Sequence, residues 1–331
     1  MTTPVEAFAA DVGPADAGAV VAVGGRTQWG AGGPLASEAL AREVRAPAGI
    51  VTVEAADMTV RVRAGTTVAD LDAALDEVGQ TVALPDWPGA TVGGILAVGH
   101  SGLRRLGWGP VRDTVLEVRY VSAQGTVVKA GGPTVKNVSG FDLCRLLVGS
   151  VGTLGLLAEV VLRTRPRPAT ERWLAGVADP FPLAARLHRP AAVLWDGTTT
   201  WVLLDGHPAD VDAQARVTGL DDADGPPALP PHRWSLRPAA LPALAARADA
   251  TDHDPTLADG GPGVPGGTGR PGTFVAEVGV GAVHADVPPP HRPVDPAVAA
   301  LHAGIKQRFD PTGRLAPGRD PLAGTARGRG A

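Results

Sequence analysis

The chain has 331 residues, including 44 glycines and 32 prolines, and 44% of its residues are hydrophobic. That hydrophobic share can form a core, so a wholly disordered chain is excluded, and the length predicts about two domains. The formal net charge of −4, without a long basic block, argues against nucleic-acid binding. A single cysteine excludes an internal disulfide and a cysteine-based metal cage, and we expect no metal site.

The first half of the chain contains short apolar runs that predict strands and helices. Ala19–Val23 is a short strand that runs into a glycine turn. Residues 58–63 alternate apolar and polar side chains, as in a half-buried strand. Thr67–Val78 has the apolar spacing of a helix, with Thr67 as its N-cap.

The next elements predict an antiparallel sheet. Val115–Val121 and Thr126–Lys129 flank a turn sequence and should pair as a hairpin. Phe141–Val148 should form a helix and Leu156–Thr164 a strand. Strands, a hairpin and few helices indicate an α+β fold.

Membrane and export signals are not evident. The N-terminal residues lack the basic and apolar segments of a signal peptide. The most apolar stretch, residues 143–162, contains Arg145 and Glu159 and predicts a buried helix plus a strand instead of a membrane span. We therefore expect a cytoplasmic protein.

The second half of the chain is looser in composition. Residues 221–272 are rich in Pro, Gly, Ala and Asp and are predicted to be a low-complexity insertion, with a short helix within 238–250. Residues 301–331 should form a helix followed by a tail.

Three glycine-rich segments lie in the first half, at residues 24–30, 88–102 and 149–155. Glycines let backbone N–H groups approach an anionic ligand closely. Neither the P-loop pattern nor the G-x-G-x-x-G dinucleotide pattern is present, and any one of these segments alone is typical of an ordinary turn.

The order of these segments and their neighbours is more specific. Four motifs follow one another along the chain: Pro88–Gly94, Gly99–Gly102, Lys136–Leu143 and Gly149–Gly155. A fifth, Arg308–Arg319, lies near the C-terminus. This arrangement resembles the FAD-binding domain of vanillyl-alcohol-oxidase-like flavoenzymes, the PCMH-type family. Within the family it resembles the FAD-binding subunits of bacterial glycolate oxidases.

The resemblance implies an α+β fold of two subdomains that hold FAD, with a small, loop-rich α+β cap. Residues 1–165 would form the FAD-binding domain, split near residue 50. Residues 166–300 would form the cap, including the insertion, and residues 301–331 would pack back on the FAD-binding domain.

The resemblance also assigns the cofactor site. The implied FAD-contacting residues lie in the three glycine-rich segments: Gly24, Gly25, Arg26, Thr27, Gln28, Pro88, Gly89, Ala90, Thr91, Gly93, Gly94, Ser101, Gly102, Gly149, Ser150, Gly152 and Thr153. Many relatives attach the flavin through a histidine in the first loop. Because Thr27 and Gln28 stand there, we expect non-covalent FAD.

Three positions carry apolar residues where many relatives have polar ones, which leaves fewer polar side chains near the site. Val151 stands where many relatives have Glu, Phe141 stands where they have Tyr, and Ala316 stands where they have Asn.

The oxidation of a 2-hydroxy acid by flavin needs a base for the hydroxyl proton and a cation for the carboxylate. His284, in a segment that resembles a family signature, is the first candidate base, and His100 is the second. Arg104 and the adjacent Arg105 are candidates for binding a carboxylate or a phosphate. A structural role is an alternative for each histidine, and a solvent-exposed position is an alternative for the two arginines.

Two functions are compatible with the resemblance. The chain is an FAD-dependent oxidoreductase that acts on a small 2-hydroxy acid, or it is an FAD-binding accessory subunit that relays electrons. In the first function, the resemblance implies two partners, a second flavoprotein subunit and an iron–sulfur subunit. A third possibility is that the chain has the family fold but does not bind flavin.

Overall fold

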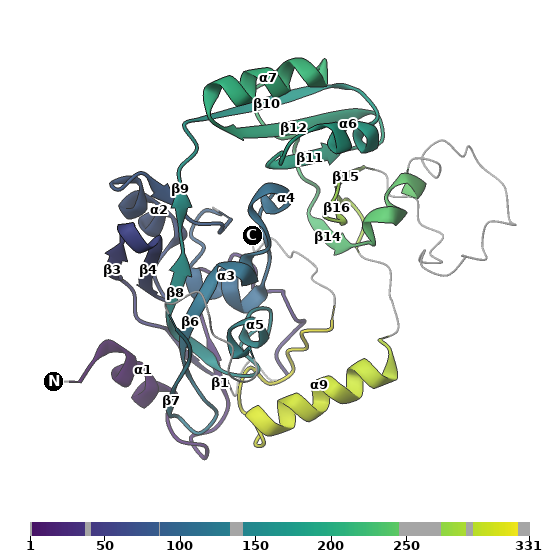
Figure 1. Cartoon of the computed structure of the whole chain (residues 1–331). Helices are drawn as coiled ribbons and strands as arrows, with labels where there is room; N and C mark the ends of the chain where they lie inside the picture. The colour runs from purple at the N-terminus through teal and green to yellow at the C-terminus, as the bar shows by residue number, and fades with distance from the viewer. Residues whose placement is uncertain are drawn as a thin grey trace, which may run out of the picture.

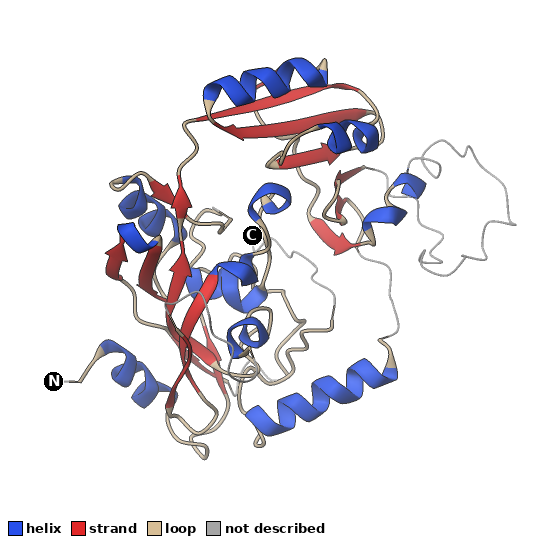
Figure 2. Cartoon of the chain, viewed as in Figure 1, coloured by secondary structure: helices blue, strands red, loops and turns tan. Residues whose placement is uncertain are grey.

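The structure, a computed structural model, describes residues 2–36, 41–85, 87–132, 142–244, 273–288 and 294–323. It contains two sheet-based parts, the N-terminal lobe (residues 2–166) and the cap (residues 170–288), with α4 between them (Figure 1). Helices and strands are mixed throughout both parts (Figure 2), which confirms the α+β class.

A five-stranded antiparallel sheet of order β3-β4-β8-β6-β7 forms the centre of the N-terminal lobe. Its strands are β3 (Ile50–Glu54), β4 (Thr59–Arg63), β6 (Val115–Val121), β7 (Val127–Gly131) and β8 (Leu156–Arg163). The alternating strand, the hairpin and the long apolar strand expected from the sequence are therefore confirmed.

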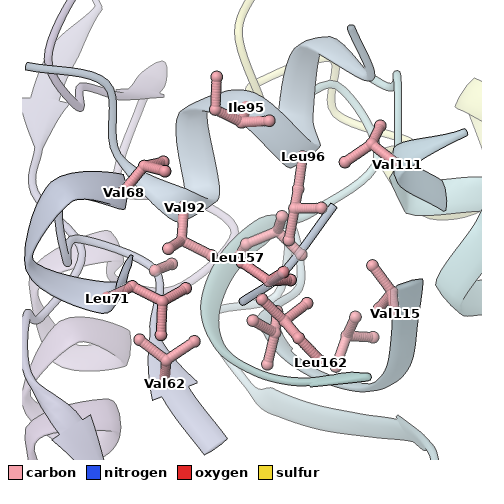
Figure 3. Close-up of a cluster of buried hydrophobic side chains, with 14 of the residues drawn as sticks. Val62, Val68, Leu71, Val92, Ile95, Leu96, Val111, Val115, Leu157 and Leu162 are labelled. Carbon is pink, nitrogen blue, oxygen red and sulfur yellow. The ribbon is translucent and has the colours of Figure 1, made fainter. Parts of the chain in front are cut away.

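Three helices pack their apolar sides onto one face of this sheet: α2 (Val68–Asp76), α3 (Val92–Val98) and α5 (Leu143–Leu147). Figure 3 shows Leu71 of α2 beside Val62 of β4, with Leu96 of α3 and Leu162 of β8 in the same buried cluster. The Thr67 hydroxyl accepts a hydrogen bond from the Asp70 N–H at 3.0 Å, so the expected N-cap is present. The helix predicted at 141–148 is present as α5, although its first predicted residue, Phe141, lies outside the described residues. Lys136 and Asn137 of the preceding motif also lie outside them.

A smaller unit covers the other side of β8. It contains α1 (Pro4–Val12) and a parallel pair, β1 (Val20–Ala22) with β2 (Arg42–Val44). Phe8 and Val12 of α1 pack against Leu156 of β8. The glycine turn that follows β1 is thereby fixed beside the main sheet.

The lobe also has short elements that connect its parts. These are η1 (Ala55–Asp57), β5 (Gln80–Thr81), α4 (Arg105–Trp108), η2 (Val111–Thr114) and β9 (Arg165–Pro166). β5 pairs with β9, where the chain leaves the lobe for the cap.

The cap is a seven-stranded sheet of order β13-β10-β12-β11-β15-β16-β14. Its strands are β10 (Thr170–Val177), β11 (Ala192–Trp195), β12 (Thr199–Gly206), β13 (Asp221–Ala223), β14 (His232–Ser235), β15 (Phe274–Glu277) and β16 (Ala282–Ala285). Helices α6 (Pro180–Arg186) and α7 (Pro208–Thr218) cover the outer face. Leu194, Leu203 and Val275 on the inner face pack with Leu103 of the N-terminal lobe.

The prediction of an insertion at 221–272 is wrong for its first part. β13 and β14 lie at the two edges of the cap sheet, and η3 (Pro238–Ala240) follows them. Edge strands tolerate the prolines and charges that made this stretch look like a loop. Residues 245–272, with the second half of the predicted helix at 238–250, lie outside the described residues.

The short helix α4 joins the two parts of the molecule. Leu106 packs against the core of the cap, while Arg104 and Trp108 reach β12. Arg104 binds the Asp205 carboxylate at 3.1 Å, and the Trp108 Nε1–H donates to the same carboxylate at 2.9 Å. α4 directly follows the second glycine segment, so that segment is tied to the cap.

The C-terminal helix α9 (Pro296–Phe309) begins five residues before the predicted start and extends along the lower edge of the molecule in Figure 1. Ile305 and Phe309 near its end pack against the core of the N-terminal lobe. The Ala316 N–H then donates to the Val20 carbonyl at 2.8 Å. None of the helices in the described ranges is both long and apolar enough to cross a lipid bilayer.

Arg314 fixes this returning segment. Its guanidinium donates hydrogen bonds at 2.7–3.0 Å to four backbone carbonyls, those of Val12, Gly13, Gly18 and Ala123. Arg314 is only 4% exposed, and its burial lowers the pKa of the guanidinium.

We expect Arg314→Met to lower the free energy of unfolding by roughly 3 kcal/mol, because four carbonyls lose their charged donor. Arg308→Met, at an exposed position of α9, is the matched control. Denaturant unfolding measures both. A loss below about 0.5 kcal/mol in Arg314→Met, the usual range for surface changes, would contradict this role.

Candidate functional site

The three glycine segments converge on two adjoining cavities beside α3. One cavity is lined by all five predicted residues of the first loop: Gly24, Gly25, Arg26, Thr27 and Gln28. The other is lined by Gly93, Ser150 and Gly152 of the second and third segments. Gly24, Thr91 and Gly94 line both. The structure therefore brings together ten of the residues predicted to contact FAD.

The first and second segments approach each other closely enough that side chains could not fit between them. A Cβ atom on Gly24 would lie 2.3 Å from the Thr91 hydroxyl oxygen. A Cβ on Gly25 would lie 1.7 Å from the Gly89 carbonyl oxygen. Glycine is required at both positions, and the cavity walls are formed largely by backbone.

The third segment is fixed to the end of α3. The Gly149 N–H donates to the Leu96 carbonyl at 3.0 Å, and the Val151 N–H donates to the Ala97 carbonyl at 2.7 Å. Gly149 and Gly152 adopt φ values of 86° and 78°, which favour glycine. Val151 adopts a φ of 47°, so the loop places a branched side chain in a strained backbone region next to the cavity.

Trp29 is one of the residues that line the first cavity. Two guanidinium groups lie over its ring, with Arg26 at 4.6 Å and Arg319 at 4.8 Å from the ring centroid. Arg26 also pairs with Glu43, so its charge is shared with a carboxylate. Arg319 was not assigned a role from the sequence, although it belongs to the C-terminal motif that supported the family resemblance.

Gln28 provides an independent test of whether the first cavity suits a polar cofactor. Both polar atoms of its side-chain amide are buried, and neither has a hydrogen-bond partner among the described residues. Buried polar groups are normally paired, so this amide calls for a ligand with donors and acceptors. With the glycine-lined backbone around it, the cavity fits the phosphate and hydroxyl chemistry of FAD.

The remaining residues predicted to contact FAD do not line the two cavities: some lie next to residues that do, and others lie elsewhere. Gly89 packs on Gly25, with Pro88 and Ala90 beside it, and the Thr153 hydroxyl binds the Ser150 carbonyl at 2.7 Å. The Ser101 hydroxyl accepts a hydrogen bond from the Val111 N–H at 3.0 Å. Gly102 lines a separate cleft of about 510 Å³ between the lobe and the cap.

His284 lies on β16, on the inner face of the cap sheet. Its Nε2 is 2.8 Å from Oε1 of Glu277, the last residue of β15. Arg233 on β14 is the register partner of His284, and its Nε is 3.5 Å from the same oxygen. All three side chains are buried. Sequence reasoning identified His284 alone, because the cross-strand register that supplies its partners is not visible in the sequence.

His100 and Arg104 occupy different surroundings. His100 is buried after the end of α3, with its ring edge-on to Trp87 at a centroid distance of 6.5 Å. Arg104 binds Asp205 and, at 2.7 Å, Glu171, and it lies over Trp108. With two carboxylates already bound, Arg104 forms a contact between the N-terminal lobe and the cap, and its charge is already paired.

Comparison with known sequences gives a consistent result. Residues 14–131 match the family described as FAD binding domain. The chain is 32% identical to the glycolate oxidase subunit GlcE of Escherichia coli over 213 residues, which is 59% of this chain and 58% of that protein. It is 40% identical to a D-lactate dehydrogenase of Archaeoglobus fulgidus over 122 residues, 36% of this chain and 26% of that protein.

A third relative is the glycolate oxidase subunit GlcD of Bacillus subtilis, 29% identical over 54% of this chain and 40% of that protein. The chain thus matches less than two thirds of the length of each of these relatives. Among solved structures, alkyldihydroxyacetonephosphate synthase aligns over 90% of this chain and 71% of its own, with a TM-score of 0.63 and 13% identity. That likeness shows the fold.

The glycine-walled cavities, the fold and these matches define a flavoprotein. Residues 14–131 match an FAD-binding domain, the chain is similar to FAD-binding PCMH-type flavoproteins, and FAD is its cofactor. Its relatives by sequence include proteins named as glycolate oxidase subunits, D-lactate dehydrogenases and an FAD-linked oxidoreductase.

We expect Gly25→Ala to weaken FAD binding at least about tenfold, because the added Cβ would push the first segment away from Gly89. The flavin-to-protein absorbance ratio after gel filtration measures this. Gly225→Ala is the control, since a Cβ there meets no atom within 4 Å. A normal flavin content in Gly25→Ala would show that the close approach is not needed.

Proposed function

We propose that the protein oxidises a small 2-hydroxy acid. The observation that carries this proposal is the buried hydrogen bond between His284 and Glu277 on the cap face that looks toward the N-terminal lobe. A histidine oriented by a carboxylate is a common arrangement for a general base. Relatives named as glycolate oxidase subunits and D-lactate dehydrogenases support the substrate class.

The three glycine segments would hold the cofactor. Backbone N–H groups of the first loop would bind the diphosphate, and the Gln28 amide would bind a polar group of FAD. Bound FAD supplies the acceptor for a hydride. Leu194 and Leu203 at the inner face of the cap, with Leu103 of the N-terminal lobe packed against them, would exclude water from this region.

Glu277 and His284 would move the proton. When Nε2–H of His284 donates to Glu277, the lone pair that accepts the proton of a substrate hydroxyl lies on Nδ1. The Glu277 carboxylate then stabilises the imidazolium that forms. His100, which is buried beside Trp87, is the alternative base.

A second candidate function is an accessory subunit that binds FAD and passes electrons on. It is favoured by the names of two relatives, which are subunits of glycolate oxidase. With one cysteine, this chain lacks the ligands for its own iron–sulfur cluster. In either function, a second flavoprotein subunit and an iron–sulfur subunit are the proposed partners.

Anaerobic mixing with glycolate or D-lactate separates the two functions. Bleaching of the flavin in the purified protein supports oxidation by this chain. A flavin that stays oxidised until a partner subunit is added supports the accessory role.

We expect His284→Gln to slow this bleaching about 100-fold or more, because removal of a general base typically costs that much. FAD content should stay normal, since His284 does not line either FAD cavity. His207→Gln, at the exposed start of α7, is the control. An unchanged rate in His284→Gln would remove His284 from the mechanism and direct attention to His100.

We also propose that FAD is held non-covalently. None of the described residues that line the two cavities is His, Cys or Tyr. Acid precipitation should therefore release all of the flavin into the supernatant. Yellow colour that stays with the denatured protein would contradict this proposal.

A further inference from the structure

The inner face of the cap carries a charged cluster that extends beyond the His284–Glu277 pair. Arg233 is only 6% exposed and Glu277 only 2%. Oxygen Oε1 of Glu277 faces both His284 and Arg233. The Arg233 Nη2 is buried and has no hydrogen-bond partner in the part of the chain that the structure describes. A buried guanidinium donor left unpaired is costly, so a ligand acceptor at this atom would be stabilising.

A second arginine lies on α4, which packs against the turn between the two strands that carry Glu277 and His284. Arg105 begins α4, and the next residue, Leu106, packs beside Gly279 just after β15. Arg105 is half-buried and lines the cleft between lobe and cap. Burial and the positive charge of Arg233 lower its pKa. Unlike Arg104, it makes no ion pair with any described residue.

The charges of this cluster do not balance. Arg105 and Arg233 are positive and Glu277 is negative, so these three groups carry one net positive charge. Arg112 and Asp113 also lie near Arg105, but both are exposed and their charges cancel. A single bound anion would neutralise the cluster.

We propose that Arg105 and Arg233 together form a binding site for the carboxylate of a small monocarboxylic acid. The site lies between α4 and β14, and its two cations come from different parts of the molecule. Guanidinium groups suit this task because they bind carboxylates with short, charge-assisted hydrogen bonds. The inference rests on the proposed function in one respect: the anion would be the 2-hydroxy acid whose hydroxyl faces His284.

The test uses a ligand that cannot be oxidised. 2-Hydroxyisobutyrate has the hydroxyl and carboxylate of the substrate class but no hydrogen on the carbinol carbon. Its dissociation constant is measured by calorimetry on the FAD-loaded full chain and, separately, by the change in the flavin absorbance spectrum. The neutral analogue 2-methylpropane-1,2-diol and inorganic phosphate are measured in the same way.

We expect Arg105→Gln and Arg233→Gln each to raise the dissociation constant of 2-hydroxyisobutyrate about tenfold or more, since each removes a charged donor. Arg105→Lys should recover part of the affinity. Arg216→Gln on α7, outside the site, should bind as the unmodified protein does. Binding of the diol should not depend on either arginine. Thermal melting shows which variants remain folded, and Arg105→Gln keeps the test valid where Arg233→Gln does not fold.

Three results would overturn the proposal. They are no binding of 2-hydroxyisobutyrate by the unmodified protein, unchanged affinity in Arg105→Gln, and tighter Arg105-dependent binding of phosphate than of the carboxylate. The proposed oxidation is tested apart from this. If glycolate and D-lactate leave the flavin oxidised while 2-hydroxyisobutyrate still binds through Arg105, the carboxylate site stands and the oxidation does not.

Discussion

The close approach of two backbone segments is the constraint on which the cofactor site depends. The first glycine loop touches the second through Gly25 and Gly89 and through Gly24 and Thr91, at distances that leave no room for a Cβ atom. This contact brings the backbones of the two loops together beside both cavities. A diphosphate needs many donors within a narrow space, and backbone supplies them without bulky side chains. The absence of a side chain at Gly24 and Gly25 is therefore as important to the cofactor site as the presence of polar groups.

The two parts of the molecule contribute different chemistry. The N-terminal lobe provides a mainly neutral backbone cradle, whereas the inner face of the cap provides charged side chains and a histidine. The short helix α4 connects them, since it follows the second glycine segment and packs into the cap. A substrate held by Arg105 and Arg233 would contact both parts at once. Substrate binding and the position of the cap would then be thermodynamically linked.

Local patterns in the sequence predicted the N-terminal lobe well, and long-range pairing limited the rest. The strand at 58–63, the hairpin after Val121 and the glycine loops depend on neighbouring residues, so periodicity and turn composition were sufficient. The partners of His284 come from strand register, and Arg104 meets a carboxylate 101 residues away. Neither contact leaves a local signal. β14 was missed because the proline-rich composition around it is also typical of loops.

Trp108 has a consequence for how the molecule can be studied. The guanidinium groups of Arg104 and Arg165 lie over its ring, at 4.8 and 4.7 Å from the ring centroid, and its N–H donates to Asp205 of the cap. Indole fluorescence responds to nearby charges and to the loss of a hydrogen bond. Because the Trp108 indole contacts cations of the lobe and a carboxylate of the cap, it is an intrinsic fluorescent probe of the contact between these two parts. Any hinge motion that separates the cap from the lobe would change its emission without an added label.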